Sequence, residues 1–331
     1  MTQLGEATYR QLLEEYLERH GSAELLHDTP TLPAVKKNRS PNQLPRLVRR
    51  RFKRYLSRIE HVLRPADKRT YWIPGRQTPR LDLAGPPPPT SGELDVAVHL
   101  HVYYLDLLPE LLAATHNVGQ PFTCYVTTDS RAKASAAASL LGEHPLTKGF
   151  EVLVTPNRGR DIGPWIVGLS DYHDRHDLWC HLHTKKSLHR PQLGEDWRHF
   201  LLQQLVGSEA SVRHILAAFE TDPGLGLVIP PFYYYAATRE FTEWEDPARA
   251  SRFFHRLGID LKLPGTPLFS AGSMCWYRPR ALRRLFEQGF RVEDFEVESG
   301  QVDTTLMHLI ERSLVYVTQA EGMGYRVLVP A

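Results

Sequence analysis

Apolar positions from residue 94 onward form short continuous runs separated by stretches with helical spacing. Continuous apolar runs are typical of buried strands, and apolar residues three or four positions apart are typical of helices. In chain order the pattern predicts a strand at 94–103, a helix at 107–115, a strand at 122–127, a helix at 132–141, a strand at 150–155, a helix at 165–169 and a strand at 178–183. Repeated strand–helix–strand units predict an α/β fold with a mostly parallel sheet covered by helices.

The N-terminal part of the chain follows a different pattern. Residues 44–63 place apolar side chains on one helical face and arginines on the others, which predicts a strongly basic amphipathic helix. Residues 73–93 contain four consecutive prolines at 86–89, so we expect an extended linker without regular hydrogen-bonded structure. The predicted organisation is a basic helical extension at 1–72, this linker, and one α/β domain at 94–331.

Polar residues cluster directly after four of the predicted strands. The carboxyl ends of parallel strands meet at one edge of a sheet, and ligands of such sheets bind there. The four clusters span residues 103–104, 127–130, 157–161 and 183–187. Their convergence on one edge is the strongest functional signal that the residues give by themselves.

The cluster after the third strand combines two arginines with a glycine. Arg158 and Arg160 can grip phosphate oxygens through paired N–H groups, and Gly159 permits a tight turn. Asp161 could bond a ribose or sugar hydroxyl, or it could serve only as the N-cap of the next helix. The segment is therefore a candidate phosphate-gripping turn, with an ordinary structural turn as the alternative.

Histidines alternate along two of the predicted strands. Period-2 geometry places His99 with His101 on one face of the first strand, and His181 with His183 on one face of the fourth. If these strands are neighbours, the four rings approach each other and a metal site is conceivable. We favour the alternative of hydrogen-bonded core histidines.

Basic residues follow the fourth strand. Lys185 or Lys186 could neutralise a diphosphate leaving group, and His183 could donate a hydrogen bond to it.

Two C-terminal segments complete the set of candidate residues. Small residues at Gly272 and Ser273 could line a sugar or acceptor pocket, or belong to a buried strand with a bulge at Gly272. Several acids between 293 and 303 precede a helix, and one of them could take the proton of an acceptor hydroxyl. Their spacing does not single one out, and acids at a helix start are also favoured by the helix dipole.

Charge and cysteine usage bear on location. Residues 36–69 hold thirteen Lys or Arg residues against Glu60 and Asp67. The basic helix at 44–63 could bind an anionic membrane surface or pack on the α/β domain with solvated arginines. We expect no nucleic-acid partner, because aromatic residues are not interleaved with the basic ones.

Three widely separated cysteines give no disulfide or zinc pattern, and no membrane-spanning or signal segment is evident. The expected location is therefore cytoplasmic.

Five segments of the chain, in order, resemble the rhamnan synthesis protein F family: 96–104, 157–164, 183–187, 271–274 and 301–312. The resemblance runs over about residues 94–325 and leaves the N-terminal 90 residues uncovered. It implies a Rossmann-type glycosyltransferase domain of the GT-A architecture that builds rhamnose-containing polysaccharides and O-antigens. The implied sugar donor is of the dTDP-L-rhamnose kind. The implied acceptor is a growing lipid-linked glycan at the cytoplasmic side of the inner membrane.

The resemblance also implies roles for individual residues. Asp303 would be the base, with His183 and Lys185 stabilising the leaving group, although Thr304 replaces a glycine of the family pattern. Residues expected at the sugar-donor site are His101, Tyr103, Asp129, Asn157, Arg158, Gly159, Arg160, Asp161 and Lys186. Residues expected at the acceptor site are Gly272, Ser273, Glu298, His308 and Glu311.

One departure from the wider GT-A group concerns the metal. Many such enzymes hold a divalent cation with an Asp-x-Asp motif, where this chain has His181 to Lys185. We predict metal-independent catalysis without a cofactor, a lysine replacing the charge of the cation; a divalent cation remains an alternative.

Alternatives stay open for the stereochemistry of the transfer and for the class of function. We expect inversion at the anomeric carbon, while retention stays open. From other classes, the alternatives are a catalytically inactive glycan- or nucleotide-binding scaffold, and a nucleotidyltransferase, which the lack of acidic pairs for Mg²⁺ disfavours.

Overall fold

A computed structural model describes residues 71–75, 77–184, 186, 191–233, 244, 246–299 and 304–330 of the chain. Its strands are β1 (Tyr71–Trp72), β2 (Arg80–Asp82), β3 (Val96–His101), β4 (Phe122–Thr128), β5 (Thr147–Val154), β6 (Leu178–His183), β7 (Leu225–Ile229), β8 (Phe232–Tyr233), β9 (Cys275–Tyr277) and β10 (Gly324–Val329). Its α-helices are α3 (Leu108–Thr115), α4 (Arg131–Gly142), α5 (Ile162–Ile166), α6 (Pro191–Val206), α7 (Glu209–Thr221), α9 (Pro247–Arg256), α10 (Pro279–Phe286) and α11 (Leu306–Ala320). Short 3-10 turns are η4 (Leu105–Leu107), η5 (His116–Val118) and η6 (Val292–Asp294).

Eight strands form one sheet in the order β2-β10-β7-β9-β6-β3-β4-β5. Neighbouring strands run parallel except at β9, which is antiparallel to both β6 and β7. The predicted α/β fold with a mostly parallel sheet is therefore confirmed. Strands β4 and β5 extend the sheet on one side of β3 while β6 lies on the other, so the strand order reverses between β3 and β6.

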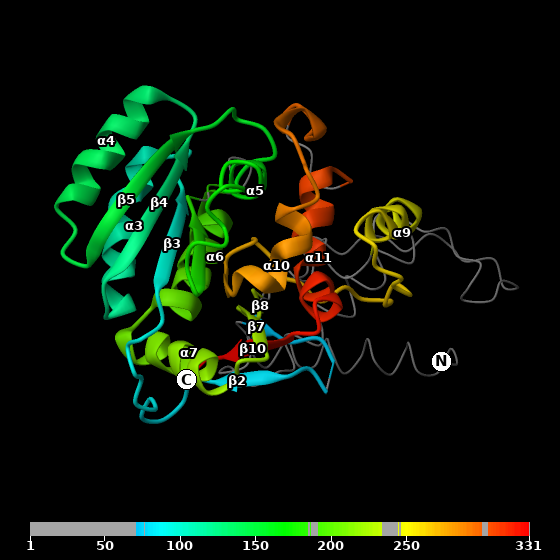
Figure 1. The fold of residues 1–331 in the computed structure, drawn as a ribbon, viewed down its shortest axis with the longest axis horizontal. Helices are drawn as coiled ribbons and strands as arrows, with labels where there is room; N and C mark the ends of the chain where they lie inside the picture. Colours follow the sequence, from blue (N-terminus) through cyan, green and yellow to red (C-terminus); the bar gives the residue numbers. More distant parts are fainter. Residues whose placement is uncertain are drawn as a thin grey trace, which may run out of the picture. The chain divides into compact units, whose positions relative to one another are not determined.

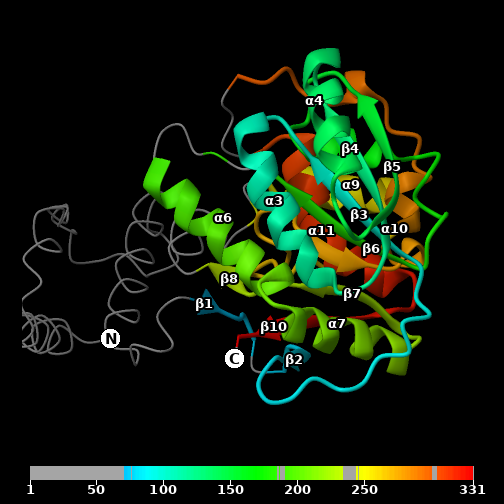
Figure 2. The ribbon, with the colours of Figure 1, turned by 90° about the vertical axis from the view of Figure 1, so that its left-hand side faces the viewer.

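Helices cover both faces of the sheet (Figure 1). An apolar core lies between the sheet and the helices on each face. One core joins the sheet to α5, α9, α10 and α11. The other joins it to α3, α4, α6 and α7, and Figure 2 looks onto this face. Alternate residues of each central strand enter opposite cores, as the pleat requires. The strands are buried on both faces, which explains their nearly continuous apolar sequence.

Helix α5 begins at Ile162, three residues before the predicted start. Pro164 lies in its first turn, where a missing backbone N–H removes no intrahelical hydrogen bond. The proline therefore supports the start of this helix instead of delaying it.

The proline-rich segment also differs from the prediction. Its residues Arg80–Asp82 form β2, which pairs in parallel with β10 at the edge of the sheet. An edge strand pairs on one side only and so tolerates proline-rich flanks. The expectation of no regular structure in residues 73–93 is wrong at this point.

The predicted extension at 1–72 and the basic helix at 44–63 lie outside the described residues, except for Tyr71 and Trp72 of β1.

No helix within the described ranges combines the length and the apolar character needed to cross a membrane.

Candidate functional site

The carboxyl ends of β3, β4, β5 and β6 meet at the reversal of strand order. Ligands of open α/β sheets bind in the crevice at such a reversal. The segments that follow these four strands carry eight of the residues predicted for the sugar-donor site: Tyr103, Asp129, Asn157, Arg158, Gly159, Arg160, Asp161 and Lys186. The topology thus brings to one edge residues that are up to 83 positions apart along the chain.

A row of buried histidines lies beside this edge, on the face that α5 covers. Parallel pairing of β3 with β6 sets His99 beside His181 and His101 beside His183. His99 Nδ1 lies 2.8 Å from His181 Nδ1, and Thr127 Oγ1 lies 2.9 Å from His99 Nε2 and 3.0 Å from His101 Nδ1. The favoured prediction of hydrogen-bonded core histidines is confirmed for these side chains. Within the described residues, no group of three His, Cys, Asp or Glu side chains is arranged to hold a metal ion.

Burial keeps His99, His101 and His181 neutral. Desolvation lowers the pKa of His101 to about 3 and that of His181 to about 4, and it lowers the pKa of His99 well below its usual value. The indole of Trp165 stacks on His181 with ring centroids 4.0 Å apart and so seals the row from the apolar core. At neutral pH the rings of His99, His101 and His181 are uncharged hydrogen-bonding groups.

Asp161 joins the row from the start of α5. Its Oδ2 lies 3.5 Å from His181 Nε2 and 3.8 Å from His183 Nε2, and it accepts a hydrogen bond from Ser273 Oγ. The side chain is 13% exposed. Asp161 occupies the N-cap position of α5, but its side chain makes no capping bond, so the alternative in which this side chain serves only as an N-cap is wrong. Burial alone would raise the pKa of Asp161, yet His183, His181 and Ser273 together hold the pKa well below its usual value.

The segment around Gly272 forms a tight turn instead of a bulged strand. Met274 N donates to Gly272 O, and the strand β9 begins only at Cys275. His183 Nε2 donates to Gly272 O at 2.8 Å, and Glu311 accepts from Gly272 N at 2.7 Å. The turn therefore links the predicted acceptor residues Gly272, Ser273 and Glu311 to the histidines and Asp161.

Unusual backbone conformations concentrate around this site. Among the described residues, the non-glycine residues with positive φ are Arg160, Ser273 and Thr304, at 52°, 61° and 71°. Such conformations cost of the order of 1–3 kcal/mol each and persist where surrounding contacts hold them. They occur in the three segments to which the sequence assigns sugar-donor binding, acceptor binding and the base.

Gly159 has φ of 72°, and a Cβ there would lie 2.4 Å from the ring of Phe295. The glycine thus makes room for a protein side chain as well as for the turn. Local sequence cannot reveal this contact, because Phe295 is 136 positions away.

The two arginines of the turn differ in their surroundings. Arg160 Nε donates to Glu298 Oε2 at 3.0 Å, and its Nη2 donates to Oε1 at 3.1 Å. Arg158 is partly buried, and no described residue forms an ion pair or hydrogen bond with its guanidinium. Asn157 is exposed beside it. Arg158 therefore presents an uncommitted cation at the strand edge, while Arg160 is oriented by a carboxylate from the acceptor side.

Lys133 is a residue that the sequence reasoning missed. Its Nζ lies 2.7 Å from Asp129 Oδ1, donates to Tyr103 O at 2.7 Å and lies 4.4 Å from the centroid of the Tyr103 ring. It thereby ties Tyr103 and Asp129 into one cluster. The spacing of Asp129 and Lys133 could have predicted this pair, because residues four apart at a helix start face the same side.

Lys186 pairs with Asp106 and lies 4.9 Å from the centroid of the Tyr104 ring. Lys185 and Asp303, two of the three predicted catalytic residues, lie outside the described residues.

His308 lies in the first turn of α11, with its Nδ1 2.6 Å from Thr305 Oγ1. Burial, aided by Arg312, lowers the pKa of His308 to about 4. The structure gives this predicted acceptor residue a neutral, oriented ring.

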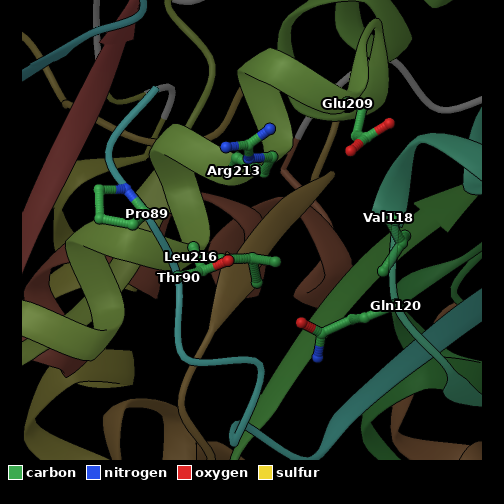
Figure 3. Close-up of a pocket in the computed structure, with 8 residues that line it drawn as sticks. Pro89, Thr90, Val118, Gln120, Glu209, Arg213 and Leu216 are labelled. Carbon is green, nitrogen blue, oxygen red and sulfur yellow. The ribbon is translucent and has the colours of Figure 1, made fainter. Parts of the chain in front are cut away.

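A surface pocket of about 260 Å³ lies elsewhere, at the amino ends of the strands. Figure 3 shows Gln120, Glu209 and Arg213 among the residues that line it. None of the predicted site residues lies in its wall, so we assign the candidate site by chemistry and topology and not by this pocket.

A model of the family described as rhamnan synthesis protein F matches residues 87–323. Two curated relatives, each described as "Uncharacterized protein WxcX", come from Xanthomonas campestris pv. campestris strains B100 and ATCC 33913. Each is 38% identical to this chain over 219 residues. The match covers 65% of this chain and 30% of each relative, so the chain spans less than a third of the relatives' length.

Proposed function

Because the chain belongs to the rhamnan synthesis protein F family, we propose that it carries a glycosyltransferase domain that uses a nucleotide-sugar donor in polysaccharide synthesis. The convergence of Arg158, Asp161 and Tyr103 at the reversal of strand order carries this proposal. The GT-A-like architecture belongs to it, supported by the mostly parallel sheet and by the position of the site. The acceptor is a growing lipid-linked glycan of a cell-surface polysaccharide or O-antigen.

The diphosphate of the donor binds at residues 157–160. The uncommitted guanidinium of Arg158 supports this role, since a guanidinium matches phosphate oxygens with paired N–H groups. Tyr103 and Asp129, held together by Lys133, take the base and the ribose. The family description favours dTDP-L-rhamnose as the donor.

In the reaction, Asp303 accepts the proton of the acceptor hydroxyl, and the hydroxyl oxygen attacks the anomeric carbon. The bond between that carbon and the diphosphate oxygen breaks, and the electron pair leaves with the nucleoside diphosphate. Arg158, Lys185 and Lys186 stabilise the developing charge, a role that fixed cations fulfil best in a site shielded from water. In-line attack inverts the anomeric centre.

The acceptor lies over the turn at Gly272 and Ser273. Glu311 fixes this turn through the Gly272 amide. Glu298 accepts from the Arg160 side chain of the phosphate-gripping turn. His308, held neutral by burial, offers a further hydrogen bond to a glycan hydroxyl.

The test is release of nucleoside diphosphate from a panel of nucleotide sugars, with glycan acceptors supplied. We expect release from one donor and a loss of about 100-fold in Arg158→Ala, a matched Arg213→Ala variant at the other end of the strands remaining unchanged. Saturable binding of a donor without any release would instead favour an inactive scaffold.

Metal independence is part of the proposal. We expect turnover to persist in a chelator, because lysines supply the charge that a cation would otherwise provide. Loss of turnover in the chelator, restored by Mg²⁺ or Mn²⁺, contradicts this part.

Binding to an anionic membrane surface through residues 44–63 is also proposed, at the cytoplasmic face of the inner membrane. The support is the basic composition of residues 36–69. Deleting 36–69 should release the protein from anionic vesicles in a flotation assay, and unchanged binding would contradict the proposal.

A further inference from the structure

The histidine row is a continuous chain of hydrogen-bonding groups that crosses three strands. It runs from Asp161 to His181, His99, Thr127 and His101, with neighbouring atoms 3.5, 2.8, 2.9 and 3.0 Å apart. His181 Nε2 is buried and makes no hydrogen bond of normal geometry, so Asp161, whose Oδ2 lies 3.5 Å away, is the acceptor available to it among the described residues. One end of the chain is therefore a carboxylate.

The carboxylate sets the direction of every hydrogen bond in the row. An ionised carboxylate only accepts, so His181 carries its hydrogen on Nε2 and accepts on Nδ1. His99 must then carry its hydrogen on Nδ1 and accept on Nε2 from the hydroxyl of Thr127. That hydroxyl has one hydrogen, so its oxygen accepts from Nδ1 of His101.

His101 ends the row with one nitrogen unused. Its Nε2 carries a lone pair and no hydrogen, and no described residue forms a hydrogen bond with it. His101 is the last residue of β3, at the edge where the sugar donor is proposed to bind, and it remains 4% exposed. Burial lowers the pKa of His101 to about 3, so the ring does not gain a second hydrogen at neutral pH.

We propose that Asp161 is a positioning residue that makes His101 an obligate hydrogen-bond acceptor, and that His101 thereby selects a hydroxyl group of the nucleotide-sugar donor. This inference rests on the proposed function for the identity of its ligand. Phosphate oxygens are acceptors at neutral pH, so a ring without a hydrogen on Nε2 gives them no hydrogen bond. Sugar and ribose hydroxyls can donate to it. His101 thus recognises a different part of the donor from Arg158.

The first test needs no ligand. Nitrogen-15 spectra of histidine-labelled full-length protein distinguish ring nitrogens with and without hydrogen. We expect the hydrogen on Nδ1 in His99 and His101, and on Nε2 in His181 and His183. His183 serves as the internal reference, because its Nε2 donates to Gly272 O. A hydrogen on Nε2 of His101 in the unmodified protein overturns the proposal.

Two substitutions test the direction of the row. Asp161→Ala removes the terminal acceptor and should allow a hydrogen to appear on Nε2 of His101, four groups away. Thr127→Val should do the same while leaving His181 unchanged. Thr128→Val is the matched control, since Thr128 is equally buried but donates to Val102 O. A spectrum of His101 that does not change in either folded variant contradicts the positioning role.

Binding measurements identify the ligand group. Thr127→Val should weaken the binding of dTDP-L-rhamnose by about tenfold, the equivalent of one lost hydrogen bond. The binding of inorganic pyrophosphate, which has no sugar hydroxyl, should stay unchanged. An equal loss with dTDP assigns the hydroxyl to ribose, and a loss with the nucleotide sugar alone assigns it to the transferred sugar. An equal loss with pyrophosphate contradicts the proposal. If the unmodified protein binds none of these compounds, the proposed function fails, while the spectra still decide the direction of the row.

Discussion

The two ends of the central strands each hold an aspartate beside a histidine, yet the two pairs differ in burial. At the amino ends, Asp95 Oδ2 lies 2.7 Å from His176 Nδ1, and the aspartate side chain is 39% exposed and also pairs with Lys148. At the carboxyl ends, Asp161 is 13% exposed and its neighbour His181 is fully buried. Water screens the first pair, whereas the second depends on protein groups alone.

The difference shows how burial changes what the same residue types do. An exposed aspartate keeps its charge through hydration and contributes little to stability. A buried aspartate keeps its charge only because donors surround it, and it then dictates the arrangement of hydrogens on its neighbours. Chemistry that needs fixed hydrogen-bonding directions is therefore expected at the carboxyl ends.

Acidification should produce the largest effect. Folding lowers the pKa of His99, His101, His181 and His308, so below their unfolded pKa near 6.5 the unfolded chain binds more protons than the folded one. The contribution of these histidines to the free energy of unfolding should therefore be fully present above about pH 7. It should fall as the pH drops toward 4, by about 1.4 kcal/mol per pH unit for each histidine. Urea unfolding between pH 7.5 and 5 measures this slope, which His101→Asn should reduce. A slope near zero would show that the row does not exclude protons.

Removing each aspartate compares the two ends directly. Asp161→Ala leaves His181 without the acceptor available to it and removes one of the two acceptors of Ser273 Oγ, the other being Gly272 O, and it should lower the free energy of unfolding by about 3 kcal/mol. Asp95→Ala loses a partly exposed pair and should cost less than about 1 kcal/mol. Urea unfolding at pH 7.5 gives both values, and equal costs would remove the distinction drawn between the ends.

Two glycines with similar backbone angles offer a finer comparison. Gly159 and Gly119 have φ of 72° and 69°, but an added Cβ would lie 2.4 Å from the Phe295 ring at the first and 3.1 Å from the flexible Glu209 side chain at the second. Gly159→Ala should cost about 2–4 kcal/mol and Gly119→Ala about 1–2 kcal/mol. Thermal or urea unfolding measures the difference, and similar costs would mean that Phe295 moves aside freely.

Arg160→Ala should have the smallest effect on stability. Its ion pair with Glu298 is exposed at 43% and 30%, so the free energy of unfolding should change by less than about 1 kcal/mol. Binding of dTDP, measured by calorimetry, should nevertheless weaken about tenfold if Arg160 contacts the diphosphate. Unchanged binding would leave Arg160 as a structural partner of Glu298.

Much of the fold was predictable from local patterns. The strands β3, β4, β5 and β6 and the helices between them follow from apolar periodicity, and the polar clusters mark their carboxyl ends. One exception has a local reason, since Pro164 starts α5 earlier than expected. The other has a long-range reason, since Arg80–Asp82 gains strand structure only from its partner β10.

The sequence by itself determined the alternation of strands and helices, the shared faces of the histidines and the family to which the chain belongs. Only the tertiary structure decided that β6 lies beside β3, that Ser273 reaches Asp161 from 112 positions away, and that Phe295 covers Gly159. Periodicity is a property of consecutive residues and shows which face a side chain occupies. Strand neighbours and long-range contacts depend on how whole elements pack, which is why the direction of the histidine row became evident only in the assembled sheet.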